Sequence, residues 1–113
     1  MSDKLKNIDF STVLTLAELV AYQPGQIVSK TLSQNKAVSL TLFAFEKGEE
    51  ISSHDSEGDA MVYVFDGTGL ITIDGKEYTV SAGETIVMPA GIQHAVYAPE
   101  RFKMLLTVIF PSR

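Results

Sequence analysis

The side chains best suited to chemistry in this sequence are two histidines, His54 and His94, and the chain has no others. Each lies in a glycine-framed segment between two predicted strands. An imidazole titrates near neutral pH and is a common ligand for transition metals, so such a pair can move protons or hold a metal ion. A single histidine in a turn more often has a structural role than a functional one. The residues around each histidine therefore indicate which of the two roles applies.

The residues around the two histidines follow a recognisable order. The first segment runs from Gly48 through His54 to Gly67, with the spacing of the pattern G-x5-H-x-H-x3,4-E-x6-G. The second matches the pattern G-x5-P-x-G-x2-H-x3-N at four fixed positions, namely Gly83, Pro89, Gly91 and His94. On these two motifs, the stretch from about Ala37 to Phe110 resembles the cupin superfamily.

This resemblance implies an all-β fold, a double-stranded β-helix or jelly-roll barrel, in which the two motifs meet at one mouth. It also implies a divalent metal held by three histidines and one glutamate. Carried over position by position, those ligands fall on His54, Ser56, Ala60 and His94, and the last motif asparagine falls on Ala98. Two histidines are good ligands for Zn, Fe, Mn, Ni or Cu, but catalytic metal sites of the zinc type usually use three protein side chains.

A nearby carboxylate is a candidate for the missing ligand. Alternate residues of an extended strand share one face, so Asp59 is expected to point away from the face that carries His54. A bulge at Gly58 would break this alternation and turn Asp59 inward. A metal site made of His54, His94 and Asp59 therefore stays open at this point.

The sequence favours a barrel that binds a small organic molecule near the two histidines. His54, Ser56 and His94 would supply the polar groups at its mouth. The same alternation predicts an apolar interior below them, lined by Val62, Val64, Val96 and Ala98. An aromatic, polyketide-like or sugar-derived ligand would suit such a cavity.

Three other functions stay open. A metal-dependent enzyme of the oxygenase or isomerase type would use His54 and His94 as metal ligands. Metal-free acid–base catalysis would use one imidazole to move a proton of a carbonyl compound. A structural accessory module would tolerate replacement of both histidines. Single-domain cupins commonly dimerise by packing or exchanging N-terminal strands, so the resemblance also implies a homodimer, with Gln26 to Leu32 as the exchanged piece.

The elements that must position these residues form one domain, because 113 residues are too few for two independent cores. We expect an N-terminal segment (1–25) followed by a β-barrel (26–113). Thr15 and Glu18 have the spacing of a capping box, which predicts a short helix over Leu16 to Ala21. The remainder predicts about nine or ten short strands. Asp66 to Gly69 is expected to be a turn between two of them, and Asp74-Gly75 predicts a tight hairpin.

Composition excludes several partners and reactions. Nine Lys and Arg against fourteen Asp and Glu give a net charge of -5, so no nucleic-acid partner is expected. No apolar run approaches the roughly 20 residues of a membrane span. The chain has no cysteine, which excludes a thiol nucleophile and favours a reducing compartment such as the cytoplasm. Serine-hydrolase and nucleotide-binding loops are also absent from the sequence.

Overall fold

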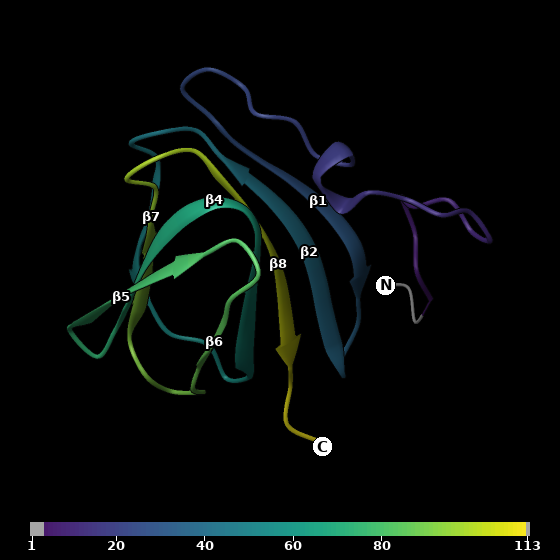
Figure 1. Ribbon diagram of the computed structural model, residues 1–113. Coiled ribbons are helices and arrows are strands. Elements are labelled where there is room, and N and C mark those ends of the chain that lie inside the picture. The colour runs from purple at the N-terminus through teal and green to yellow at the C-terminus, as the bar shows by residue number, and fades with distance from the viewer. Residues whose placement is uncertain (1–3, 113) are drawn as a thin grey trace.

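The computed structural model describes residues 4–112, and nearly all of its regular structure is β-strand. Its elements are a short 3-10 helix, η1 (Leu16–Glu18), and the strands β1 (Ile27–Gln34), β2 (Val38–Phe45), β3 (Glu50–His54), β4 (Asp59–Ile73), β5 (Lys76–Ser81), β6 (Thr85–Met88), β7 (His94–Tyr97) and β8 (Phe102–Ile109). Antiparallel pairing joins these strands into a sheet that curls on itself (Figure 1). The predicted all-β jelly-roll fold is confirmed.

The curled sheet has two halves that share the long strand β4. The first half has the order β1-β2-β8-β4-β6, and Asp59–Gly67 supplies its part of β4. The second half has the order β3-β7-β4-β5, and Thr68–Ile73 supplies the continuation of β4. One strand therefore passes from the first half-sheet into the second and holds them together.

The predicted turn at Asp66 to Gly69 is wrong, because β4 runs through it without interruption. The register against β8 shifts between Val64 and Asp66, which marks a bulge. Gly67 then has φ +71°, and a Cβ there would lie 2.1 Å from the carbonyl oxygen of Arg101. Glycine at this position allows the strand to bend while it stays close to β8, so a turn-forming composition here produces a bend within one strand.

The predicted hairpin at Asp74-Gly75 is confirmed, and β1 and β2 form a second hairpin. Asp74 and Gly75 both have positive φ, 50° and 80°, as a tight turn between β4 and β5 requires. The β1-β2 hairpin turns at residues 35–37, where the Asn35 side chain accepts hydrogen bonds from the backbone of Ala37 and Val38. Along this hairpin β1 pairs with β2 of its own chain from Ile27 to Gln34.

The main core lies inside the curl of the sheet. Alternate residues of β4 point into it, and Ala60, Val62 and Val64 are buried while the residues between them are exposed. The rings of Phe45 and Phe102 stack there with their centroids 4.7 Å apart. Complete burial of each such large side chain contributes about 1.5–3 kcal/mol to stability.

The short helix predicted over Leu16 to Ala21 forms as a single 3-10 turn, Leu16–Glu18, and ends three residues earlier than predicted. The Thr15 side chain makes no capping hydrogen bond. The segment instead packs apolar side chains against the outer face of the first half-sheet, where Val20 and Leu42 join a second buried cluster. A helix of six residues is too short to be stable by itself, so this packing decides the conformation.

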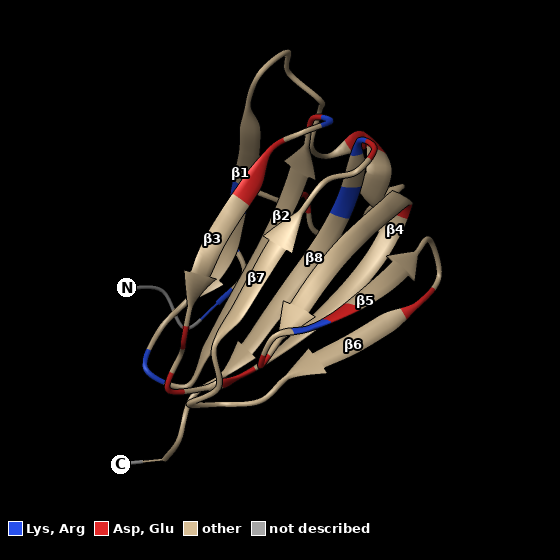
Figure 2. Ribbon diagram, turned by 90° about the vertical axis from the view of Figure 1, so that its left-hand side faces the viewer, with Lys and Arg blue, Asp and Glu red and all other residues tan. Residues whose placement is uncertain are grey.

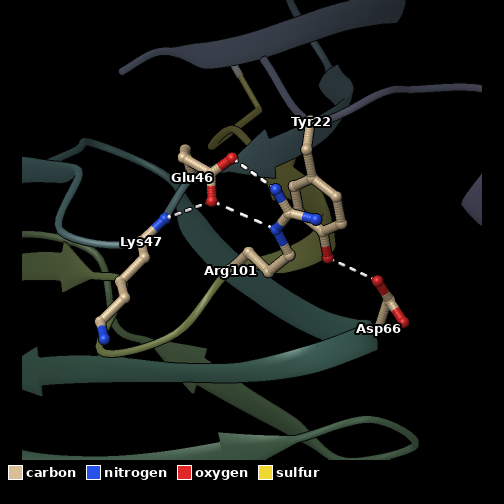
Figure 3. Close-up of polar contacts among 5 residues, drawn as sticks. All are labelled: Tyr22, Glu46, Lys47, Asp66 and Arg101. Carbon is tan, nitrogen blue, oxygen red and sulfur yellow. Dashed lines mark hydrogen bonds and ion pairs between the residues drawn. The ribbon is translucent and has the colours of Figure 1, made fainter. Parts of the chain in front are cut away.

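A polar cluster also holds the N-terminal segment to the barrel (Figure 3). The Tyr22 hydroxyl donates to the carboxylate of Asp66 on β4. The Arg101 guanidinium lies over the Tyr22 ring, 4.5 Å from its centroid, and donates two hydrogen bonds to Glu46. Burial, with the hydrogen bond to Asp66, raises the pKa of Tyr22 well above its ordinary value. These contacts fix the end of the segment before β1.

Charged residues lie mainly in the loops and toward the strand ends of the barrel (Figure 2). Within residues 4–112, no helix has the length and apolar character needed to cross a membrane.

Candidate functional site

The structure brings the two histidines of the sequence motifs together. His54 ends β3 and His94 begins β7, and the two residues are direct cross-strand partners. Their Nε2 atoms are 3.1 Å apart, and their rings meet edge to face with centroids separated by 4.3 Å. A bulge between Ile51 and His54 adjusts the end of β3 so that the two rings converge.

The other nitrogen of each ring lies against a backbone carbonyl. His54 Nδ1 is 2.9 Å from the oxygen of Ser52, and His94 Nδ1 is 3.2 Å from the oxygen of Ile92. This geometry assigns the hydrogen of each neutral ring to Nδ1, where it donates to the carbonyl. The lone pairs of the two Nε2 atoms then face each other. The pair is therefore an acceptor site that suits a proton, the hydrogen of a ligand or a metal ion.

The two rings differ in their exposure. His94 is 4% exposed, whereas His54 is open to solvent. Burial lowers the pKa of His94 below its ordinary value of 6.5, and the neighbouring His54 acts in the same direction. His94 is therefore the neutral form at pH 7, with a lone pair available at Nε2.

The histidine pair lies at the polar end of a cavity of about 280 Å³ inside the barrel. The polar residues of its lining are His54, Asp55, Ser56 and His94. The rest of the lining is apolar and comes from five strands: Ile51, Ala60, Met88, Val96, Met104, Leu106 and Val108. The arrangement is an apolar chamber with two imidazoles at one end.

The predicted lining residues divide into two groups. Val96 lines the cavity, and so do Ser56 and Ala60, the two positions at which the metal motif is incomplete. Val62, Val64 and Ala98 are fully buried in the surrounding core and do not line the cavity. Alternation along the strands therefore identified the side chains that point into the barrel. It did not show which of these side chains border the cavity and which are packed in the core.

Ser56 links the two motif segments to each other. Its carbonyl oxygen accepts a hydrogen bond from the backbone N–H of Gly91, and its hydroxyl oxygen accepts one from the backbone N–H of Gly58. A Cβ at Gly58 would lie 2.6 Å from the carbonyl oxygen of Ile109, so the chain between His54 and β4 can pass this close to β8 because residue 58 is glycine.

The donor set does not complete the metal site that the fold family implies. The Asp59 carboxylate accepts a hydrogen bond from the backbone N–H of Ala90 and is exposed. Among residues 4–112, no three His, Cys, Asp or Glu side chains are grouped so that they could hold a metal ion. Two imidazoles converge, but Ser56 and Ala60 stand where the other ligands would be, so the residues present do not fit the four-ligand centre.

Sequence reasoning missed several lining residues. Asp55 lines the cavity beside His54, although neighbouring residues of an extended strand point to opposite faces. Met104, Leu106 and Val108 pair with Val64, Val62 and Ala60 across the β4-β8 ladder, so they share the inward face. Their alternation within Phe102 to Phe110 was the available signal, but the strand pairing needed to use it was not visible in the sequence.

Comparison with known proteins identifies relatives of the whole chain. The model of the cupin domain family matches residues 41–110. A conserved protein of unknown function from Streptococcus pyogenes is 47% identical, with a TM-score of 0.95, over 100% of this chain and 98% of that one. A cupin superfamily protein from Desulfitobacterium hafniense is 30% identical, with a TM-score of 0.91, over 96% and 99%. No curated protein matched the chain.

A more distant likeness concerns the fold alone. A salicylate 1,2-dioxygenase from Pseudoaminobacter salicylatoxidans is 14% identical, with a TM-score of 0.68, over 74% of this chain and 26% of that one. That protein is an enzyme with a similar barrel, whereas no activity is stated for the proteins from Streptococcus pyogenes and Desulfitobacterium hafniense. The family match, the near relatives and the histidine pair agree: this chain belongs to the cupin family.

Proposed function

We propose that this protein binds a small organic molecule in the barrel cavity, with the polar group of the ligand against His54 and His94. The observation that carries the proposal is a mostly apolar cavity whose lining includes two imidazoles with their Nε2 atoms 3.1 Å apart. Binding sites for small molecules have this character, with mostly apolar walls and a few polar groups that fix orientation.

The size of the cavity supports a ligand built on one ring. A cavity of about 150 Å³ accepts benzene, and sites for drug-sized ligands begin at about 300 Å³. The 280 Å³ found here suits a substituted single ring or an aliphatic chain of similar volume.

The polar end of the cavity supports a ligand whose head group donates a hydrogen bond. With both Nδ1 hydrogens directed at backbone carbonyls, the imidazoles offer acceptors and no free donor. Apart from the histidines, Asp55 is the one ionisable residue of the described lining, and it carries negative charge. An alcohol or phenol satisfies these acceptors, whereas a carboxylate or phosphate meets no lysine or arginine there.

Matched probes test the proposal. Isothermal titration against chelator-treated, untagged protein would compare 4-methylphenol with 4-methylanisole, which lacks the donor, and with 4-methylbenzoate, which carries charge. We expect the phenol to bind at least tenfold more tightly than either, and His54→Ala to remove most of this preference. Tyr97→Ser, at an exposed position outside the cavity lining, is the control variant. Absence of binding by all three probes, or preference for the benzoate, would contradict the proposal.

A second candidate is a metal-dependent cupin enzyme of the oxygenase or isomerase type. It is supported by the convergence of the two Nε2 atoms, which is the arrangement of two neighbouring ligands on one ion. The incomplete donor set argues against it. Elemental mass spectrometry of untagged protein decides between the two. Near one equivalent of a transition metal in the parent, lost in both His54→Ala and His94→Ala, would favour the enzyme.

A further inference from the structure

The polar end of the cavity carries a carboxylate beside the two imidazoles. Asp55 directly follows β3 and lines the cavity together with His54 and His94. Asp55 and His54 are exposed to solvent, whereas His94 is buried, so this end of the cavity lies next to water. A ligand can therefore place its apolar body inside the barrel and keep its head group at the boundary with solvent.

The electrostatics of this end favour a positive head group. The Nε2 lone pairs of His54 and His94 face each other across 3.1 Å, which concentrates negative potential between the two rings. Asp55 adds a full negative charge, and among residues 4–112 no lysine or arginine forms an ion pair with it. Its field reaches the buried ring: burial and His54 lower the pKa of His94, and the charge of Asp55 acts in the opposite direction.

The chain around Asp55 is held in place by hydrogen bonds. The residue lies between His54, which ends β3, and Ser56. The carbonyl oxygen of Ser56 accepts a hydrogen bond from the backbone of Gly91 at 2.8 Å, and its hydroxyl oxygen accepts one from the backbone of Gly58 at 3.2 Å. Residue 55 therefore keeps its position beside the imidazoles before a ligand arrives, which lowers the entropic cost of binding.

We propose that the ligand is a primary amine, bound as its ammonium cation, and that Asp55 is the residue that selects it. The inference rests on the proposed function, because it concerns the head group of the molecule in the same cavity. One N–H of the ammonium donates to the Asp55 carboxylate and another to the Nε2 acceptors of the imidazoles. The apolar walls hold the remainder of the ligand, a single ring or a branched chain of similar volume.

An amine uses these groups more fully than an alcohol or phenol does. A hydroxyl has one hydrogen to donate, whereas an ammonium has three and carries a charge that the carboxylate can pair with. An alkylamine has a pKa of about 10 and an imidazole one of about 6.5, so at pH 7 the proton stays on the ligand. Because the polar end lies next to water and the charge is paired there, the cost of removing the ammonium from water is limited.

Two probes that differ in the head group test the inference. Isothermal titration of untagged, chelator-treated protein at pH 7 and low salt would compare 4-methylbenzylamine with 4-methylbenzyl alcohol. We expect the amine to bind at least tenfold more tightly. Raising the salt concentration should reduce this ratio, because the exposed carboxylate of Asp55 is screened by ions.

Two matched variants locate the source of the preference. Asp55→Asn keeps the size of the side chain but removes its charge, and it should lower the ratio of the two affinities at least fivefold. Asp59→Asn removes the same charge from the same segment, but Asp59 accepts a hydrogen bond from Ala90 and does not line the cavity. This control should change the ratio less than twofold. Circular dichroism confirms that each variant is folded.

The outcomes separate this inference from the proposed function. Equal affinity for the two probes, or tighter binding of the alcohol, would overturn the assignment of an amine and leave a barrel that binds neutral ligands. A preference for the amine that Asp59→Asn lowers as much as Asp55→Asn does would come from the net charge of the protein, and it would overturn the role of Asp55. Absence of binding by both probes would overturn the proposed function as well.

Discussion

Restoring the two missing motif side chains would convert the histidine pair into a metal site. Ser56 and Ala60 line the same cavity as His54 and His94. The double substitution Ser56→His and Ala60→Glu therefore adds an imidazole and a carboxylate where cupins of the metal-binding type carry them. We expect this variant to bind Zn²⁺ much more tightly than the parent does.

Two free energies set the response of this variant to Zn²⁺: the cost of burying the new carboxylate and the stabilisation by the bound ion. Ala60 is 2% exposed among apolar side chains, so a carboxylate there without a counter-charge destabilises the fold by about 3 kcal/mol. Zn²⁺ at 100 times its dissociation constant stabilises the folded variant by about 2.7 kcal/mol. Since 1 kcal/mol shifts the Tm of a domain of this size by about 4 °C, Zn²⁺ should raise the Tm of the variant by roughly 10 °C and that of the parent by far less.

Differential scanning calorimetry on untagged protein, with and without Zn²⁺, measures this shift, and isothermal titration gives the stoichiometry. The matched control is the same double variant with His94→Ala, whose response to Zn²⁺ should be several-fold smaller. No Tm increase in the double variant, or an equal increase in the control, would refute the inference that these four positions surround one site.

Three further outcomes follow from particular contacts. Gly67→Ala should lower the free energy of unfolding in urea by about 3 kcal/mol, because the added Cβ would lie 2.1 Å from a backbone oxygen. Gly75 has a similar φ but open space around it, so Gly75→Ala should lower the free energy of unfolding by about 1 kcal/mol. Equal losses in the two variants would contradict the close approach at Gly67. Tyr22→Phe should cost about 1–2 kcal/mol through the lost bond to Asp66. Since the pKa of Tyr22 is raised, parental stability should also fall as pH rises above 10, and less so in the variant. The lowered pKa of His94 predicts stability that is intact above pH 6.5 and falls below it, an effect that His94→Gln should reduce.

The parts of the fold that the sequence predicted are those encoded by local geometry. Asp74-Gly75 forms the expected hairpin because two adjacent residues must adopt positive φ, a requirement that few dipeptides meet. That His54 and His94 would meet was implied by the resemblance of their segments to two motifs of one family, and the structure pairs the two residues across β3 and β7. Burial of Ala60 and Val62 on one face followed from simple alternation.

The parts that could not be predicted depend on contacts between distant segments. The sequence around Gly67 is typical of a turn. Its role in a bend of β4 depends on the backbone of residues 101 and 102, which lies against it in the folded chain. Thr15 and Glu18 have the spacing of a capping box, but the packing of the segment against Leu42 decides its conformation instead. The extent of the cavity depends in the same way on Met104 and Leu106 of β8, which lie more than thirty residues from His54 in the sequence.

The position of β8 in the sheet has a consequence for biogenesis. β8 follows every other strand in the chain, yet in the sheet it lies between β2 and β4. Until residue 109 has left the ribosome, the β1-β2 hairpin has no partner at its inner edge, and that side of β4 is also unpaired. The barrel therefore closes once β8 has been made, through long-range pairing that is slow compared with local folding. During that interval the nascent chain exposes two strand edges that are open to pairing with other chains.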